Sequence, residues 1–234
     1  MHKKPLKLTL VILSLIIVSC SSKKEYDLSE VRMPYSIDNL VNDKFETRFK
    51  ENLDNVIARY TSEDPKLLVF DDISFEKEFS AKYFSPTTLE FYADSTSTHI
   101  NYIALKTSVV EDSNDLYTAL LEKFGKPKYY NKDTAFFNGL WQVDNTYFVF
   151  KQSFNSAVGG EKSIRTKLMI IDVTKDELVN RFLSIDFDKY KKYLKELAKQ
   201  SDKSNFSYEN FVKSQEEEGY KNKYQEEIDN NLPL

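Results

Sequence analysis

The chain has 234 residues, a formal charge of −4 at pH 7 and a hydrophobic content of 41%, which is enough to build a buried core. An acidic chain is a poor partner for nucleic-acid phosphates, because their binding relies on clustered Lys and Arg, so no nucleic-acid binding is expected. A single cysteine, Cys20, excludes a disulfide framework, and two histidines exclude a histidine-rich metal site.

The first residues have the layout of a secretory signal. Three lysines precede a mostly apolar run over residues 8–18, and the small residue Ser19 stands immediately before Cys20. The apolar run is too short to cross a bilayer as a helix, which takes about 20 residues. The sequence therefore predicts export with removal of residues 1–19, and a plain signal peptide with an incidental cysteine is the alternative.

The four residues from Ile17 to Cys20 resemble the lipobox of bacterial lipoproteins. The resemblance covers these residues only, and it implies lipidation, including palmitate, at Cys20 and a membrane partnership through that N-terminal lipid. Ser21 stands where Asp would signal retention in the inner membrane, which implies the outer membrane and its periplasmic side. The mature chain would then carry 30 cationic and 37 acidic residues, a formal charge of −7.

Two segments follow the lipidation site. Residues 20–36 are polar and predict a tether between lipid and domain. Over residues 37–60, apolar residues recur every three or four positions, which predicts one long amphipathic helix beginning after Ser36. Its polar face mixes both charges, so we expect it to pack on the domain's own sheet instead of lying on the membrane.

Strands and a central helix are expected next. Residues 66–71, 87–93 and 98–108 are rich in β-branched and aromatic residues and predict strands, and 73–79 alternates more weakly. A central helix is indicated by an apolar face made of Leu116, Tyr117, Leu120, Leu121 and Phe124. Asp112 or Ser113 can cap its N-terminus, and Gly125 with Pro127 ends it.

Residues 135–154 predict a hairpin around a two-residue loop, Asp144 and Asn145. That loop sets a register with four facing pairs: Val143 with Thr146, Trp141 with Phe148, Gly139 with Phe150, and Phe137 with Gln152. One face of the hairpin is then almost entirely aromatic, which predicts a core position for Phe137, Trp141, Phe148 and Phe150. A ring lying over the bare backbone explains the glycine.

The C-terminal third contains a central strand over 164–173 and helices over 174–184 and 187–199, and the first of these helices has Thr174 and Glu177 at capping-box spacing. Residues 201–234 form a charged tail, loose or partly helical. Altogether the pattern predicts one α+β domain over 37–200. Its largely antiparallel sheet packs against an N-terminal amphipathic helix, a central helix and C-terminal helices.

Binding residues are expected among exposed phenols and a glycine loop. Phenols combine apolar area with a polar tip, and glycines let backbone amides converge; the candidates are Tyr129, Tyr130, Tyr147, Gly159, Gly160 and Lys162. His99 lies near Ser and Asp residues, but no nucleophile motif accompanies it. The carboxylate groups at 71–78 and 172–177 lack calcium-loop spacing. No catalytic residue, metal site or cofactor is assigned.

These features favour a lipid-anchored envelope protein with a non-enzymatic binding or assembly role, and another envelope protein is its candidate partner. Two alternatives stay open. An immunity or inhibitor lipoprotein would present a concentrated acidic surface to a basic target. An envelope hydrolase would gather His99 with carboxylates in a pocket.

Overall fold

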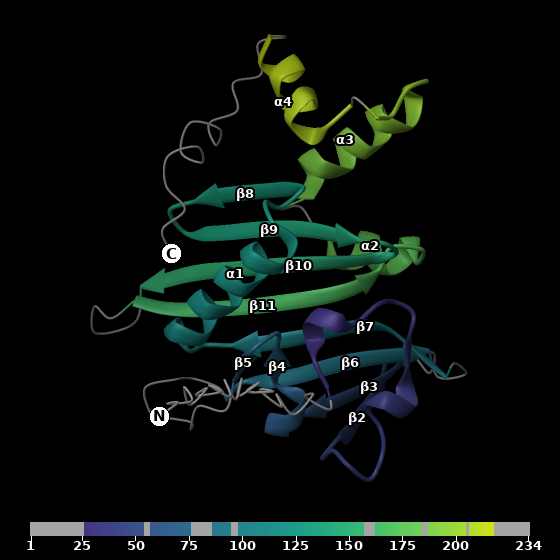
Figure 1. Cartoon of the computed structure of the whole chain (residues 1–234), viewed down its shortest axis with the longest axis vertical. Helices are drawn as coiled ribbons and strands as arrows, with labels where there is room; N and C mark the ends of the chain where they lie inside the picture. Colours follow the sequence, from purple (N-terminus) through teal and green to yellow (C-terminus); the bar gives the residue numbers. More distant parts are fainter. Residues whose placement is uncertain are drawn as a thin grey trace, which may run out of the picture.

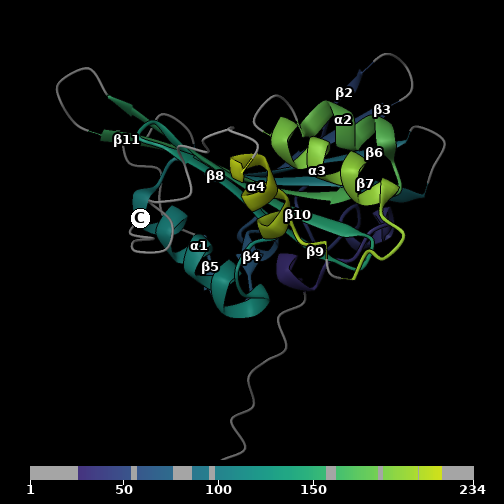
Figure 2. The same ribbon diagram turned by 90° about the horizontal axis from the view of Figure 1, so that it is seen from above.

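A computed structural model describes residues 26–53, 57–75, 86–94, 98–156, 162–183, 187–204 and 206–217. One large antiparallel sheet runs through this part of the chain, with a layer of other elements on each face (Figures 1 and 2). The α+β fold class with a largely antiparallel sheet is confirmed. Within the described residues, no helix is both long and apolar enough to cross a bilayer.

The sheet follows the strand order β2-β3-β6-β7-β11-β10-β9-β8, and β1 pairs with the start of β7. The bounds of these strands are β1 Tyr35–Ser36, β2 Arg48–Leu53, β3 Ile57–Ser62, β6 Thr88–Asp94, β7 His99–Thr107, β8 Tyr129–Asp133, β9 Phe136–Val143, β10 Thr146–Ser156 and β11 Lys162–Asp172. Strand β11 lies between β7 and β10 and is apolar on both faces through its middle, as its sequence predicts.

The β9–β10 hairpin has the predicted register. All four expected pairs are present, including Gly139 with Phe150. Asp144 takes the positive φ of 50° that the tight turn requires. The rings nearest Gly139 belong to its own strand: a Cβ at Gly139 would lie 2.9 Å from the Trp141 ring and 3.3 Å from that of Phe137. The glycine is therefore required by the close approach of Trp141.

The front face of the sheet carries helix α1 (Val110–Phe124), the small β4–β5 hairpin (Val69–Phe70 and Ile73–Ser74) and three 3-10 turns, η1 (Leu28–Glu30), η2 (Ile37–Asn39) and η3 (Pro65–Leu67) (Figure 1). Gly125 ends α1 with a φ of 72°, as predicted. The expected caps are wrong: α1 begins after Val109, and both Asp112 and Ser113 are buried inside it. Packing against the sheet extends the helix beyond its polar start.

The first described residues differ from the expected tether. Within the segment expected to be solvated, Tyr26, Leu28, Val31 and Met33 are buried in the front core. Their apolar side chains are spaced too irregularly to predict a helix or a strand. They are buried because they pack on a hydrophobic surface formed by residues distant in sequence. The folded domain therefore includes residues 26–36.

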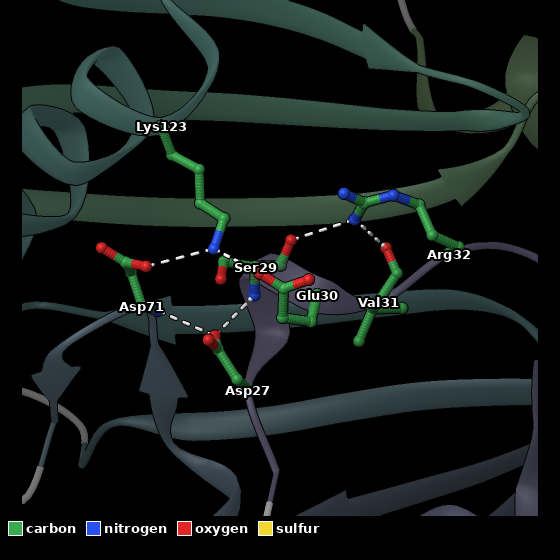
Figure 3. Close-up of polar contacts among 7 residues, drawn as sticks. All are labelled: Asp27, Ser29, Glu30, Val31, Arg32, Asp71 and Lys123. Atoms are coloured by element: carbon green, nitrogen blue, oxygen red, sulfur yellow. Dashed lines mark hydrogen bonds and ion pairs between the residues drawn. The ribbon is translucent and has the colours of Figure 1, made fainter. Parts of the chain in front are cut away.

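Polar contacts attach this segment to the rest of the front layer (Figure 3). The Asp27 carboxylate accepts hydrogen bonds from the backbone N–H groups of Ser29 and Asp71, each at 2.8 Å. Asp71 sits at a positive φ of 54°. The Lys123 ammonium on α1 pairs with both Glu30 and Asp71. One carboxylate and one ammonium thus join three separate parts of the chain.

The long N-terminal helix predicted over residues 37–60 is wrong. The described residues of this stretch form η2 and the strands β2 and β3. The reason is pairing at long range: β3 aligns with β6, and the Tyr60 ring stacks on Phe91 with centroids 5.1 Å apart and an interplanar angle of 6°. Sheet pairing and this aromatic contact override the three-and-four spacing of apolar residues.

The rear face is covered by α2 (Asp176–Phe182), α3 (Asp188–Lys199) and α4 (Tyr208–Glu217) (Figure 2). These helices bury a second core on the sheet, which includes Tyr102, Met169 and Tyr190. The capping box is wrong, because the Thr174 hydroxyl donates to Asp172 instead of capping α2. Part of the expected tail is helical, since α4 buries Phe211 and Val212. One end of β11 extends past these helices (Figure 2).

Candidate functional site, a basic pocket on the rear face of the sheet

Three neighbouring strands change character along their rear face. In β7 the rear positions run from Tyr102 and Ala104 to Lys106, and in β11 they run from Ile171 and Met169 back to Lys167 and Arg165. In β10 the apolar positions Tyr147 and Val149 give way to Lys151 and Ser153. The apolar half lies under the helices. The charged half lies beyond them, because lysine and arginine are costly to bury without partners.

Strand register brings three lysines together. Lys106 faces Lys167 across β7 and β11, and Lys167 faces Lys151 across β11 and β10. The next partner along this line is Asn138 on β9. Neighbouring strands lie about 4.8 Å apart, so the three lysines are adjacent on one face of the sheet. We call Lys106, Lys167 and Lys151 the lysine row.

A cavity of about 780 Å³ opens over the lysine row. Its walls come from β6, β7, β9, β10 and β11, and its polar lining includes Thr88, Glu90, Lys106, Asn138, Lys151, Ser153, Arg165 and Lys167. Four cationic and two acidic side chains line it, the second acid being Glu63. This basic pocket is a concentration of positive charge in a chain whose formal charge is −4.

Glu90 is the acidic centre of the pocket wall. Its side chain is 8% exposed, and its two carboxylate oxygens pair separately with Arg59 and Lys106, each at 2.6 Å. Burial opposes ionisation of Glu90, but the hydrogen bonds from Lys106 and Arg59 outweigh burial and lower its pKa. Glu90 therefore neutralises the β6 side of the site and anchors one end of the lysine row.

The middle of the row has aromatic neighbours. The Lys167 ammonium lies 5.6 Å from the ring centre of Tyr102 and 5.8 Å from that of Phe182, and these two rings stack on each other with centroids 4.0 Å apart. The Lys151 ammonium lies 5.2 Å from the ring centre of Phe187. Cation–π contacts of this kind attract a lysine without neutralising its charge.

The arrangement disfavours the charged form of Lys167. Burial lowers its pKa from 10.5 to about 8, and the positive charges of Lys106, Lys151 and Arg59 act in the same direction, against the attraction of Glu90. Such an ammonium is favourably placed to receive an anion, which would offset the surrounding positive charge. An amine that is partly neutral near pH 8 can also act as a nucleophile, the chemistry an enzyme would use.

The structure places two of the sequence-predicted phenols in the core, which corrects the expectation that they are exposed. Tyr129 is 1% and Tyr147 6% exposed, and both rings contact Tyr190 of α3. Their phenols are covered because α3 packs over β8 and β10, a contact that no local pattern reveals. Tyr130 lies on the other face of β8 and is half-buried.

Tyr130 does line a second cavity, of about 380 Å³, near Tyr193 and Tyr208. Lys162 is the first residue of β11, the strand that contributes Lys167 to the lysine row, and it pairs with Ser156. Gly159, Gly160 and the lipidation candidate Cys20 lie outside the described residues.

His99 is exposed at the start of β7, where its Nδ1 lies 3.2 Å from the Thr98 hydroxyl. It lines neither of the two cavities. In the described ranges, no three His, Cys, Asp or Glu side chains gather as metal ligands would. Of the carboxylates singled out in the sequence, Asp172 is buried and accepts from the Thr174 backbone N–H, which is a structural role.

The lysine row was missed by sequence reasoning, although a local signal exists. In each of β7, β10 and β11, alternate residues switch from apolar to lysine within one strand. A strand that lies wholly under a helical layer would stay apolar on that face. This local pattern does not reveal that β7 pairs with β11, since α1 and three strands separate them in sequence.

Comparisons with known proteins return no match: no family model, no curated protein and no solved structure resembles the chain.

Proposed function

We propose that the protein is a lipid-anchored protein of the bacterial cell envelope with a non-enzymatic binding role, and that the basic pocket is its ligand-binding surface. The observation that carries the binding role is an open cavity of about 780 Å³ on the sheet, whose lining draws on five strands and includes four cationic and two acidic side chains. Ligand pockets typically measure about 300–1,000 Å³ and present a few convergent polar groups.

The anchoring part of the proposal rests on the N-terminal sequence. The charged start, the apolar run and the lipobox-like residues ending at Cys20 support lipidation and an outer-membrane location facing the periplasm. A protein held at a membrane surface meets its ligands or protein partners in one layer, which raises their effective concentration.

The two alternatives have less support. An inhibitor of a basic target needs a concentrated acidic surface, whereas the pocket has twice as many cationic as acidic side chains in its lining. A hydrolase centred on His99 needs carboxylates beside the imidazole in a cavity, and His99 lines neither cavity. A non-enzymatic binding role therefore remains our choice.

Crosslinking in intact cells tests both parts of the proposal. The wild-type protein is compared with Cys20→Ala and with Ser153→Trp, which places a bulky ring in the pocket, and Ser201→Trp at an exposed bend is the matched control. We expect partners captured by wild type and Ser201→Trp to be lost with Ser153→Trp and with the soluble Cys20→Ala chain. Undiminished capture by Ser153→Trp would refute the pocket, and a Cys20→Ala chain that stays on the membrane would refute the lipid anchor.

A further inference from the structure

The lysine row is an unfavourable arrangement for an empty sheet surface. Like charges that face each other directly across antiparallel strands destabilise the sheet, and the row contains two such pairs, Lys106 with Lys167 and Lys167 with Lys151. Opposite charges or neutral polar residues at these positions would avoid this repulsion. Three consecutive lysines therefore indicate that something other than stability keeps them there.

Cationic side chains outnumber acidic ones in the lining of the pocket, by four to two. Glu90 is shared between Lys106 and Arg59, so one carboxylate serves two cations. The contacts of the Lys167 ammonium are with the rings of Tyr102 and Phe182. Arg165 adds a further cation on the same strand, two residues before Lys167 and on the same face. The lining of the pocket therefore carries an excess of positively charged side chains.

The size and spacing of the site define what can fill it. From Lys106 to Lys151 the row spans two strand spacings, or about 10 Å. A single anionic group reaches one or two neighbouring ammonium groups, whereas groups spread over this length reach all three. Ser153, Thr88 and Asn138 add neutral polar groups to the lining, and these can donate hydrogen bonds to the same oxygens.

We propose that the basic pocket binds a small polyanion, a molecule with two or more phosphate or carboxylate groups, laid along the lysine row. Its anionic groups pair with Lys106, Lys167 and Lys151 and remove the repulsion among them. This assignment rests on the proposed function, because it names the ligand class of the same pocket. The concave shape suits a small molecule or a lipid headgroup that enters the cavity, and a flat membrane surface would not reach its floor.

Calorimetric titration of the full chain in a non-ionic detergent tests the assignment. The probes are tripolyphosphate and citrate, with glycerol as a neutral probe, and vesicles of phosphatidylglycerol or phosphatidylcholine distinguish a headgroup from a free anion. We expect binding of at least one soluble polyanion, weakening as salt rises from 0.05 to 0.3 M because screening reduces the attraction. Vesicle binding that tripolyphosphate displaces would identify a headgroup as the source of the anion.

Matched variants locate the binding. Lys167→Gln and Lys151→Gln are each expected to weaken polyanion binding about tenfold or more, since each removes a charge-assisted hydrogen bond to the anion. Lys195→Gln, on the exposed face of α3, is expected to leave it unchanged. Removing a repelled charge does not endanger folding, and the fluorescence of Trp141, buried in the front core, reports the fold of each variant.

Two results would overturn the assignment: a folded wild-type chain that binds no polyanion, or binding that the lysine substitutions leave unchanged. If cellular capture still depends on Ser153 while no polyanion binds, the pocket keeps its binding role and only the ligand class fails. If a polyanion binds but capture does not depend on Ser153, the ligand class stands and the proposed partner role fails.

Discussion

Substituting Lys167 by Met should make the protein more stable while it removes the centre of the basic pocket. Methionine keeps most of the length of the side chain and its contact with the rings of Tyr102 and Phe182, but carries no charge. Relief from burial of a charge and from the repulsion of Lys106 and Lys151 then favours the folded state. A residue that destabilises the fold and lines a cavity is a common feature of functional sites.

The magnitude follows from the pKa of Lys167, which lies at about 8 in the folded protein against an ordinary 10.5. At 1.36 kcal/mol per pKa unit, holding the ammonium charged at pH 7 costs the folded state at most about 3 kcal/mol. Solvent screening of a partly exposed side chain and the lost cation–π contacts reduce the net gain to about 1 kcal/mol. A gain of this size raises Tm by about 2–4 °C in a domain of this length.

Dependence on pH separates this electrostatic cause from better packing. Between pH 8 and 10.5 the unfolded chain binds a proton at Lys167 that the folded chain has lost, so wild-type stability rises with pH in this window. The variant lacks that group, and its advantage is therefore greatest below pH 8 and shrinks toward pH 10.5. The charged and titratable groups around Lys167 come from four other strands and from α2; they are Lys106, Lys151, Glu90, Arg59, Tyr92, Tyr102 and Arg181.

Urea unfolding of wild type, Lys167→Met and the exposed control Lys195→Met at pH 7 and pH 10 measures the effect. The expected result is a gain for Lys167→Met at pH 7, a smaller gain at pH 10, and no change for the control. A variant less stable than wild type at pH 7, or an advantage that does not change with pH, would refute the reasoning and show that the ammonium contributes net stability.

Three further changes test the framework around the site. Glu90→Gln should cost about 2 kcal/mol at pH 7, because two cations lose their carboxylate. The lowered pKa of Glu90 means its stabilisation is present above about pH 4.5 and lost on acidification, so urea midpoints of the variant should fall less than those of wild type between pH 5 and pH 3. Gly139→Ala should cost about 1–3 kcal/mol in thermal unfolding, because the new methyl would meet the Trp141 ring at 2.9 Å, and an unchanged Tm would contradict this contact. Asp27→Ala should lower the free energy of unfolding by about 1–2 kcal/mol, because it leaves the Asp71 backbone N–H without its acceptor. Proteolysis near the N-terminus should be faster in this variant, whereas Asp27→Asn should be cleaved at a rate closer to that of wild type.

The local features of the fold were readable in the sequence. The β9–β10 register follows from a two-residue loop and strict alternation, both of which act over neighbouring residues. The end of α1 follows from Gly125, whose positive φ only glycine adopts easily. Helix spacing also placed α2 and α3, and an apolar run on both alternations placed β11, because these patterns lie within each element's own residues.

Only the tertiary structure decided which of several local patterns prevailed. The apolar spacing before Ser62 fits a helix, yet β3 pairs with β6 and contributes Tyr60 to the core, since pairing and burial outweigh a weak local preference. The sequence favoured exposed phenols at Tyr129 and Tyr147, yet the docking of α3 buries both of them. The segment after Tyr26 is buried because residues distant in sequence form the front core on which it packs.

The basic pocket belongs to this second class. Alternation within β10 and β11 is enough to place Lys151 and Lys167 on one face of their strands, and Lys106 lies likewise on a face of β7. Their assembly into one row depends on the register of β7 against β11, strands that are far apart in the chain. Such a register is set by packing across the whole sheet. The sequence alone determined the charges and their spacing along each strand, and the sheet brought them together.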